Sequence, residues 1–300
     1  MEHWTSQRTQ LQQQLKSILD IRFKGLQVRS RAKWFEEGEK SSSYFHRLIA
    51  ARRKANTMHT LLDGSGQQVS EIGDMLKCST IFYSQLYARG STCPMSQQHL
   101  LSFLTSRLTA DQVSLLEAQI SEEEVRTAIR VSPENSSPGP DGLSFEFYKC
   151  FEELLTPFLC KMFNHLLIQY ESWPSTKRTF ITLIYKEKGV VEDLKNWRPI
   201  SLINCDLKLF TRILANRLQS VIHSLVHPDQ AGFIKGRLIQ HNAIRVQQIL
   251  ELSRIQQLEG YLIFLDQEKA YDRVDWEYLH LCLEKMVFGI HWINIIGYLY

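Results

Sequence analysis

A short apolar run that ends in a carboxylate, Tyr-Leu-Ile-Phe-Leu-Asp at residues 261–266, constrains the fold of this chain most. Its β-branched and aromatic residues predict a buried strand over residues 261–265. Because a strand is rigid and its end opens onto solvent, Asp266 could hold a hydrated metal ion there. The alternative is an ordinary turn, with Asp272 and Asp275 as caps of the helix expected to follow.

Most other patterned segments predict helices. In residues 206–225 the apolar side chains recur at helical spacing, and Ser121 with Glu124 forms a capping-box pattern. A second strand is predicted at residues 179–185, a turn at 63–66 and a linker at 89–99. The fold class expected is therefore α+β and mostly helical. The predicted helices cover residues 6–56 (broken near Gly38), 70–88, 121–131, 144–150, 152–171, 206–225, 238–257 and 274–286.

A basic segment follows the strand at 179–185 and forms a second candidate site. It carries Lys186 and Lys188, and Arg198 comes ten residues after Lys188. On a β-hairpin such side chains can bind a triphosphate, because Arg binds oxygen pairs and Lys supplies a point charge. The alternative is a solvated basic turn. A third candidate is the rigid turn at residues 137–142 (Ser-Pro-Gly-Pro-Asp-Gly), whose backbone N–H groups could contact phosphate; it could equally be a generic turn.

Charge is distributed unevenly along the chain, although the formal net charge is only +3. Residues 1–60 carry 12 Lys and Arg against 5 Asp and Glu, an excess of 7, and residues 176–245 show the same 12 against 5. Two basic blocks could meet a polyanion such as nucleic acid, or they could be solvated faces.

The remaining composition indicates an intracellular protein, nuclear or cytoplasmic. Six cysteines show no Cys-x-x-Cys pair and no zinc-type spacing, which favours reduced thiols over disulfides. The Gln-rich start, residues 1–15, is too polar for a signal peptide. Apolar runs such as 261–265 are too short to cross a bilayer, so no membrane association is expected.

Several sequence blocks follow one another in a fixed order, and this order identifies a protein family far more specifically than any single block does. Together they resemble the first blocks of LINE-type (non-LTR) retrotransposon reverse transcriptases, and the resemblance covers residues 29–300. The segment 29–61 is similar to the stretch between endonuclease and polymerase in these elements. The polymerase blocks are residues 136–149, 181–189, 196–204, 214–218, 227–237 and 264–276.

The resemblance implies a helical basic extension over residues 1–100, followed by a reverse transcriptase domain over residues 101–300. That domain would be a partial right-hand polymerase, with the fingers and an incomplete palm. Its partners would be an RNA template, a DNA primer and dNTPs, and its cofactor Mg²⁺, with no small-molecule cofactor. Block 136–149 matches a segment that grips template RNA, and block 227–237 has no assigned role.

Individual residues also take roles from the resemblance. Asp266 matches the first metal-binding aspartate of the palm, and the backbone carbonyl of Gln267 would be a weaker second ligand. Tyr271 matches the aromatic residue that excludes a ribose 2′-hydroxyl by steric clash. Lys186 or Lys188 matches, with Arg198, finger positions near the incoming triphosphate.

The sequence departs from the family in one respect that bears on activity. The paired-aspartate motif, Tyr/Phe-Ala-Asp-Asp, does not occur in these 300 residues, and neither does the Arg-Gln-Gly-Cys-Pro-Leu motif that precedes it. Two metal ions about 4 Å apart need at least two well-placed carboxylates. Three hypotheses result: an inactive, truncated reverse transcriptase; an RNA-binding module without catalysis; or an enzyme completed by another chain. An exposed sheet edge and apolar surface near residues 261–265 and 292–300 are expected to favour aggregation.

Overall fold

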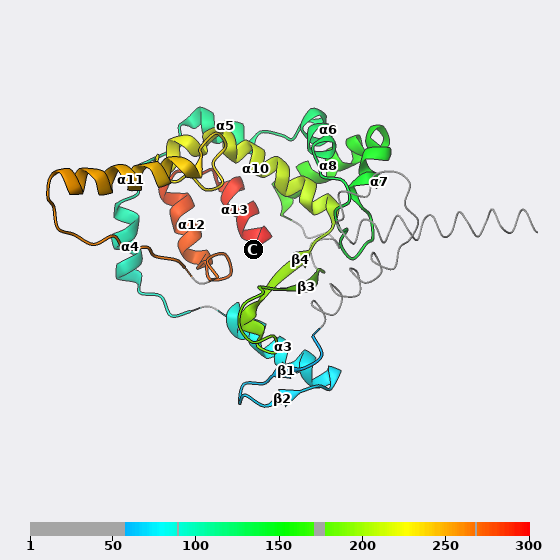
Figure 1. Ribbon diagram of the computed structural model, residues 1–300. Coiled ribbons are helices and arrows are strands. Elements are labelled where there is room, and N and C mark those ends of the chain that lie inside the picture. The colour runs from blue at the N-terminus through cyan, green and yellow to red at the C-terminus, as the bar shows by residue number, and fades with distance from the viewer. Residues whose placement is uncertain (1–57, 89, 171–177, 268) are drawn as a thin grey trace, which may run out of the picture. The chain divides into compact units, whose positions relative to one another are not determined.

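The computed structural model describes residues 58–88, 90–170, 178–267 and 269–300. The helix predicted at residues 6–56, and with it nearly all of the first basic block, lies outside the described residues. The described residues divide into two compact units, one within residues 58–82 and 181–200, the other within residues 83–180 and 201–300. Figure 1 labels their helices and strands. The domain boundary near residue 100 stays a prediction.

The first unit contains a short antiparallel hairpin, β1 (Leu61–Leu62) and β2 (Gln68–Val69), in which Leu61 pairs with Val69. The Asp63 carboxylate closes the turn by accepting hydrogen bonds of 2.9 Å from the backbone N–H groups of both Ser65 and Gln67. This confirms the predicted turn. The helix α3 (Ile72–Leu86) follows, as predicted.

A second hairpin consists of β3 (Phe180–Tyr185), the 3₁₀ turn η1 (Leu194–Asn196) and β4 (Trp197–Leu202). Its anchor is Trp197, which is 1% exposed and donates from its indole Nε1 to the Val191 carbonyl at 2.7 Å. The backbone N–H of Leu62 donates to the Glu192 carbonyl at 2.9 Å, so the two hairpins are joined. The strand predicted at 179–185 is confirmed.

The second unit is helical, and its core lies between α8 and α10. Phe163 of α8 and Phe210 of α10 are fully buried, with ring centroids 5.3 Å apart. Apolar spacing along 206–225 predicted the buried face of α10 correctly. The helices are α4 (Pro94–Ser102), α5 (Ala110–Glu117), α6 (Glu122–Arg130), α7 (Phe145–Cys150), α8 (Glu152–Gln169), α10 (Cys205–Leu225), α11 (Ile239–Ile255), α12 (Trp276–Lys285) and α13 (Ile290–Leu299).

A buried arginine ties α10 to the segment between α5 and α6. Arg217 is 7% exposed, and its guanidinium donates to both carboxylate oxygens of Glu124, at 2.7 and 3.0 Å. It also donates to the carbonyls of Leu116, Ala118 and Gln119 at 2.5–3.0 Å. Burial raises the pKa of the Glu124 carboxyl, but hydrogen bonds from Arg217 and the Ser121 segment outweigh burial and leave this pKa below its usual value. Because the folded-state pKa is lowered, Glu124 stabilises the fold at neutral pH, and this contribution is lost as the pH falls through that pKa.

The strand predicted at 261–265 is wrong. Residues 258–267 form no regular structure, and Tyr261 and Leu265 are 99% and 91% exposed. A strand obtains its backbone hydrogen bonds from neighbouring strands. Within the described residues the only ladders are the two hairpins, so this segment has no strand to pair with. Its apolar side chains are exposed as expected, but not as a sheet edge.

Two further expectations need correction. The linker predicted at 89–99 includes the start of α4, because Pro94 occupies the first turn of that helix, where its missing N–H costs nothing. Most of the apolar segment 292–300 lies in α13 and contributes to the core, with Trp292 2% exposed, whereas Tyr300 follows the helix and is 59% exposed. The helix α5 was not predicted. The expected tendency to aggregate stays a prediction.

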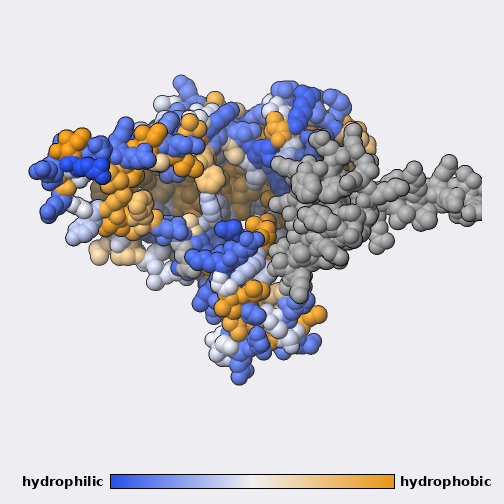
Figure 2. Space-filling model, viewed as in Figure 1, coloured by the Kyte–Doolittle hydropathy of each residue, from blue (hydrophilic) through white to orange (hydrophobic). Residues whose placement is uncertain are grey.

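Apolar surface occurs instead on α11. That helix has no buried residue, and its isoleucines and leucines stand among polar side chains on the face shown in Figure 2. Among the described residues, no helix is long and apolar enough to cross a membrane.

Candidate functional site

The basic hairpin β3–β4 presents its three predicted cations differently. Lys186 is half-buried and its Nζ donates to the Lys195 carbonyl at 2.7 Å. Lys188 and Arg198 are exposed, and within the part of the chain that the structure describes neither forms an ion pair. Of the three predicted cations, Lys188 and Arg198 are therefore available to an anionic ligand, while Lys186 fixes the base of the loop.

The loop between these strands is held in one conformation. Glu187 and Gly189 both have positive φ, 56° and 84°, and the Asn196 side chain donates to the Val190 carbonyl at 2.8 Å. A Cβ at Gly189 would lie 2.6 Å from that Asn196 side chain, so glycine is required there. The Tyr185 hydroxyl donates to the Gly189 carbonyl at 2.5 Å, which gives Tyr185 a role in shaping the loop.

Asp266 and Gln267 lie in the exposed segment 258–267 of the other unit. One carboxylate and one backbone carbonyl are hard oxygen donors of the kind that suit Mg²⁺, which usually keeps several waters. No cluster of three His, Cys, Asp or Glu side chains that could hold a metal occurs among the described residues. The donors present thus fit one ion with a largely hydrated shell, not a pair of ions.

Tyr271 lies on the turn that precedes α12 and is 75% exposed. Its ring meets the Phe233 ring edge-on, with centroids 6.1 Å apart and an interplanar angle of 80°. Asp275 caps α12, because its carboxylate accepts from the Tyr278 N–H at 2.7 Å. This confirms the capping interpretation for Asp275. Asp272 does not cap this helix; its side chain lines a cavity instead.

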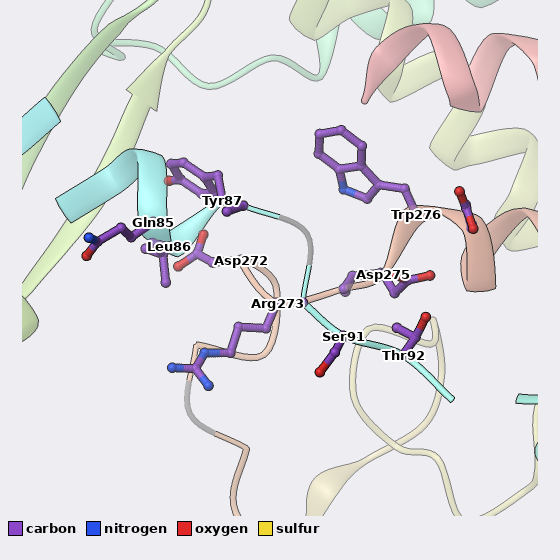
Figure 3. Close-up of a pocket in the computed structure, with 13 residues that line it drawn as sticks. Gln85, Leu86, Tyr87, Ser91, Thr92, Asp272, Arg273, Asp275 and Trp276 are labelled. Atoms are coloured by element: carbon purple, nitrogen blue, oxygen red, sulfur yellow. The ribbon is translucent and has the colours of Figure 1, made fainter. Parts of the chain in front are cut away.

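Asp272 faces a cavity that the sequence did not predict. The cavity has a volume of about 830 Å³ and is lined by residues 85–88 and 90–92 together with residues 272–277 at the start of α12. Figure 3 shows the Asp272 carboxylate pointing toward Tyr87, with the Trp276 indole on the other side and the Arg273 guanidinium directed away. Burial, and secondly the charge of Asp272, raise the pKa of the Tyr87 hydroxyl, so Tyr87 stays a neutral hydrogen-bond donor.

The turn at 137–142 packs against the N-terminus of α10. The Asp141 N–H donates to Asn204 Oδ1 at 3.3 Å, and Lys208 Nζ donates to the Ser137 carbonyl at 3.1 Å. At Gly139 an added Cβ would lie 2.1 Å from Asn204 Oδ1 and 2.5 Å from the Asn204 backbone nitrogen. The glycine therefore allows close approach of two backbones. Packing accounts for this turn, and its predicted contact with phosphate stays a prediction.

The block at 227–237, to which sequence reasoning gave no role, is a pinned loop. Arg237 donates to the carbonyls of His227 and Gln230 at 2.6 and 2.9 Å. The side chain of Gln219, on α10, donates to the Phe233 carbonyl at 2.7 Å and accepts from the Lys235 N–H at 3.1 Å. The only feature of the sequence at 227–237 that could have indicated such a loop was its content of Gly and basic residues.

The predicted site residues thus fall into two groups. Lys186, Lys188 and Arg198 share the hairpin of the first unit, whereas Asp266, Gln267 and Tyr271 follow one another along the second. The second group gains a neighbour from a distant block, since Phe233 contacts Tyr271.

Comparison with known proteins bears on both groups. Residues 184–296 match the family model for reverse transcriptase (RNA-dependent DNA polymerase), a range that holds all six predicted site residues. An uncharacterized 149 kDa protein of transposon TX1 from Xenopus laevis is 29% identical over 286 residues, 95% of this chain and 22% of that protein. A probable RNA-directed DNA polymerase from transposon BS of Drosophila melanogaster is 30% identical over 57% of this chain and 19% of that protein.

A retrovirus-related Pol polyprotein from the type-1 retrotransposable element R2 of Popillia japonica is 28% identical over 169 residues, 56% of this chain and 22% of that protein. These matches confirm the predicted resemblance. The chain spans about a fifth of the length of the relatives it matches.

Proposed function

We propose that this chain, which carries a reverse transcriptase domain of the non-LTR retrotransposon kind, forms the fingers and part of the palm of an RNA-directed DNA polymerase. The observation that carries the proposal is the family match over residues 184–296, which holds the end of β3, the basic loop, β4 and the Asp266 segment in order. Its partners would be an RNA template, a DNA primer and dNTPs.

Lys188 and Arg198 would contact the triphosphate or the nucleic-acid backbone. Both are exposed on a hairpin whose loop is fixed by Asn196, so their side chains start from a rigid base. Arg binds phosphate oxygens bidentately and Lys acts as a point charge, a pair suited to a polyphosphate. Lys186, already bonded to the Lys195 carbonyl, would act by holding the loop.

Asp266 and the Gln267 carbonyl would hold Mg²⁺. Nucleotidyl transfer uses two such ions: one would carry the triphosphate and neutralise its charge, and the other would activate the primer 3′-oxygen. Tyr271 would stand where a ribose 2′-hydroxyl must be excluded, because its exposed ring can clash with that group.

Catalysis needs more carboxylates than these residues supply. The 300-residue sequence holds no paired-aspartate motif, and one carboxylate does not position two ions. We therefore expect the chain by itself to bind RNA without extending a primer. A polymerase completed by residues on another polypeptide is the alternative.

Primer extension decides between these outcomes. On an RNA template with Mg²⁺ and dNTPs, we expect no extension by the chain or by Asp266→Ala. Extension that disappears in Asp266→Ala would mean that other carboxylates of this chain complete the site. Extension that persists in Asp266→Ala would indicate a contaminating polymerase.

RNA binding by the hairpin is tested by its salt dependence. Affinity for RNA falls as salt rises, and removing one phosphate contact makes the slope of log affinity against log salt less steep by about 0.7 for a single strand. We expect Lys188→Ala and Arg198→Ala each to make the slope less steep by about this amount. The matched control is Lys161→Ala, an exposed lysine of α8 in none of the family blocks, which should leave the slope unchanged. Equal slopes for all variants would contradict a role of this hairpin.

A further inference from the structure

Phe233 adopts a backbone conformation that phenylalanine seldom adopts. Its φ is +62°, in the left-handed region, and its side chain is 83% exposed. A bulky residue is strained at positive φ, where glycine or asparagine would be more stable. An exposed ring gains little from burial, so burial of the Phe233 ring does not compensate for that strain.

The surrounding loop maintains this conformation. The Gln219 side chain donates to the Phe233 carbonyl and accepts from the Lys235 N–H, as described above. Next to Phe233, Ile234 is 9% exposed and anchors the loop in the protein interior. Gly236 supplies a second positive φ, +82°, and Arg237 closes the loop on the His227 carbonyl. Strain that is held in place by so many contacts is typical of functional positions.

The surroundings of the ring indicate the kind of ligand. Its one aromatic neighbour in the described part of the chain is Tyr271, which meets it edge-on and is itself 75% exposed. Lys235 is exposed two residues away and can meet a phosphate. An exposed aromatic ring next to a cation is the combination that binds an unpaired base and its backbone phosphate.

We propose that Phe233, oriented by the edge of Tyr271, is a stacking surface for an unpaired base of the RNA template. The proposal rests on the proposed function, because Tyr271 is expected beside the sugar of the incoming nucleotide. A base stacked on Phe233 would then be held close to the point where template and nucleotide meet. Stacking is tolerant of sequence, since every base has a π-face.

The experiment compares binding and stability in the same variants. Phe233→Gly removes the ring and relieves the strain, and Phe233→Tyr keeps a stacking ring. The probes are a short single-stranded RNA and an abasic RNA of equal length. The matched control is Val287→Gly, which relieves the same strain (φ +62°) at an exposed residue between α12 and α13.

For Phe233→Gly we expect roughly 5- to 150-fold weaker binding of the base-containing RNA, because stacking on an aromatic ring contributes that much per base. Its affinity for abasic RNA should not change, and its melting temperature should be equal to or above that of the wild type. Phe233→Tyr should bind as the wild type does. Val287→Gly should melt at the same or a higher temperature without any change in binding.

Two results would overturn the stacking surface alone. One is unchanged affinity of Phe233→Gly for the base-containing RNA, with salt slopes that still respond to Lys188 and Arg198. The other is a lower melting temperature of Phe233→Gly, which would make the ring a structural element. A wild-type chain that binds neither RNA would overturn the proposed function as well, so the two failures can be told apart.

Discussion

Replacing Arg217 by Met should lower the free energy of unfolding by about 3–5 kcal/mol, the range found when one partner of a buried ion pair is removed. The guanidinium satisfies the Glu124 carboxylate and three backbone carbonyls. Met fills similar space but donates no hydrogen bond, so the three carbonyls and Glu124 Oε1 would lose this donor, while Glu124 Oε2 would keep its bonds from Ser121. Denaturant unfolding of the purified chain measures the loss.

Two variants make this result specific. Arg217→Lys keeps the charge but cannot reach four acceptors at once, so most of the loss should remain. Arg212→Ala is the matched control, because Arg212 lies on the same helix and makes a single hydrogen bond of 3.3 Å, to the Val131 carbonyl. That variant should change stability by no more than about 0.5 kcal/mol. A loss below about 1 kcal/mol for Arg217→Met would show that the ion pair is dispensable.

Arg217 also shows what the sequence could predict and what it could not. The capping box of Ser121 and Glu124 was predictable, since both residues lie within one helical turn, and both of its hydrogen bonds are present. The bond between Arg217 and Glu124 joins residues 93 positions apart, and nothing local indicates it. Sequence reasoning identified the block at 214–218 by resemblance, without the reason for its arginine.

The segment 261–265 illustrates the opposite error. Its composition favours a strand, but a strand exists only when neighbouring backbone supplies its hydrogen bonds. Among the described residues no such neighbour is present, and the segment is exposed. Short-range patterns predicted Asp206–Leu225 and Phe180–Tyr185 well, because an amphipathic helix and a hairpin strand are stabilised by nearby residues.

The candidate site was predictable to a similar extent. Resemblance selected Lys186, Lys188 and Arg198, but only the structure separates Lys186, bound to a backbone carbonyl, from the two exposed cations. The pairing of Tyr271 with Phe233 depends on a contact between two blocks that lie 38 residues apart. Side-chain geometry of this kind has no signature in residue spacing.

Replacing Gly139 by Ala is the second substitution with a large expected effect. The new methyl group would lie 2.1 Å from Asn204 Oδ1, 2.5 Å from the Asn204 nitrogen and 2.6 Å from the Ile203 carbonyl carbon. Two of these atoms belong to the backbone and cannot move aside. The turn would have to separate from the N-terminus of α10, with a loss of about 2–3 kcal/mol in the free energy of unfolding.

A comparison within the same turn separates steric from conformational effects. Gly142 has φ +74° with no atom within 4 Å of an added Cβ, so Gly142→Ala should cost only its backbone strain, about 1 kcal/mol. Adding Asn204→Ala to Gly139→Ala should restore little stability, because the backbone contacts remain. Full restoration by that double substitution would mean that the Asn204 side chain alone excludes a larger residue. Recovery of less than about half of the loss would assign the requirement for glycine at 139 to the contact between the two backbones.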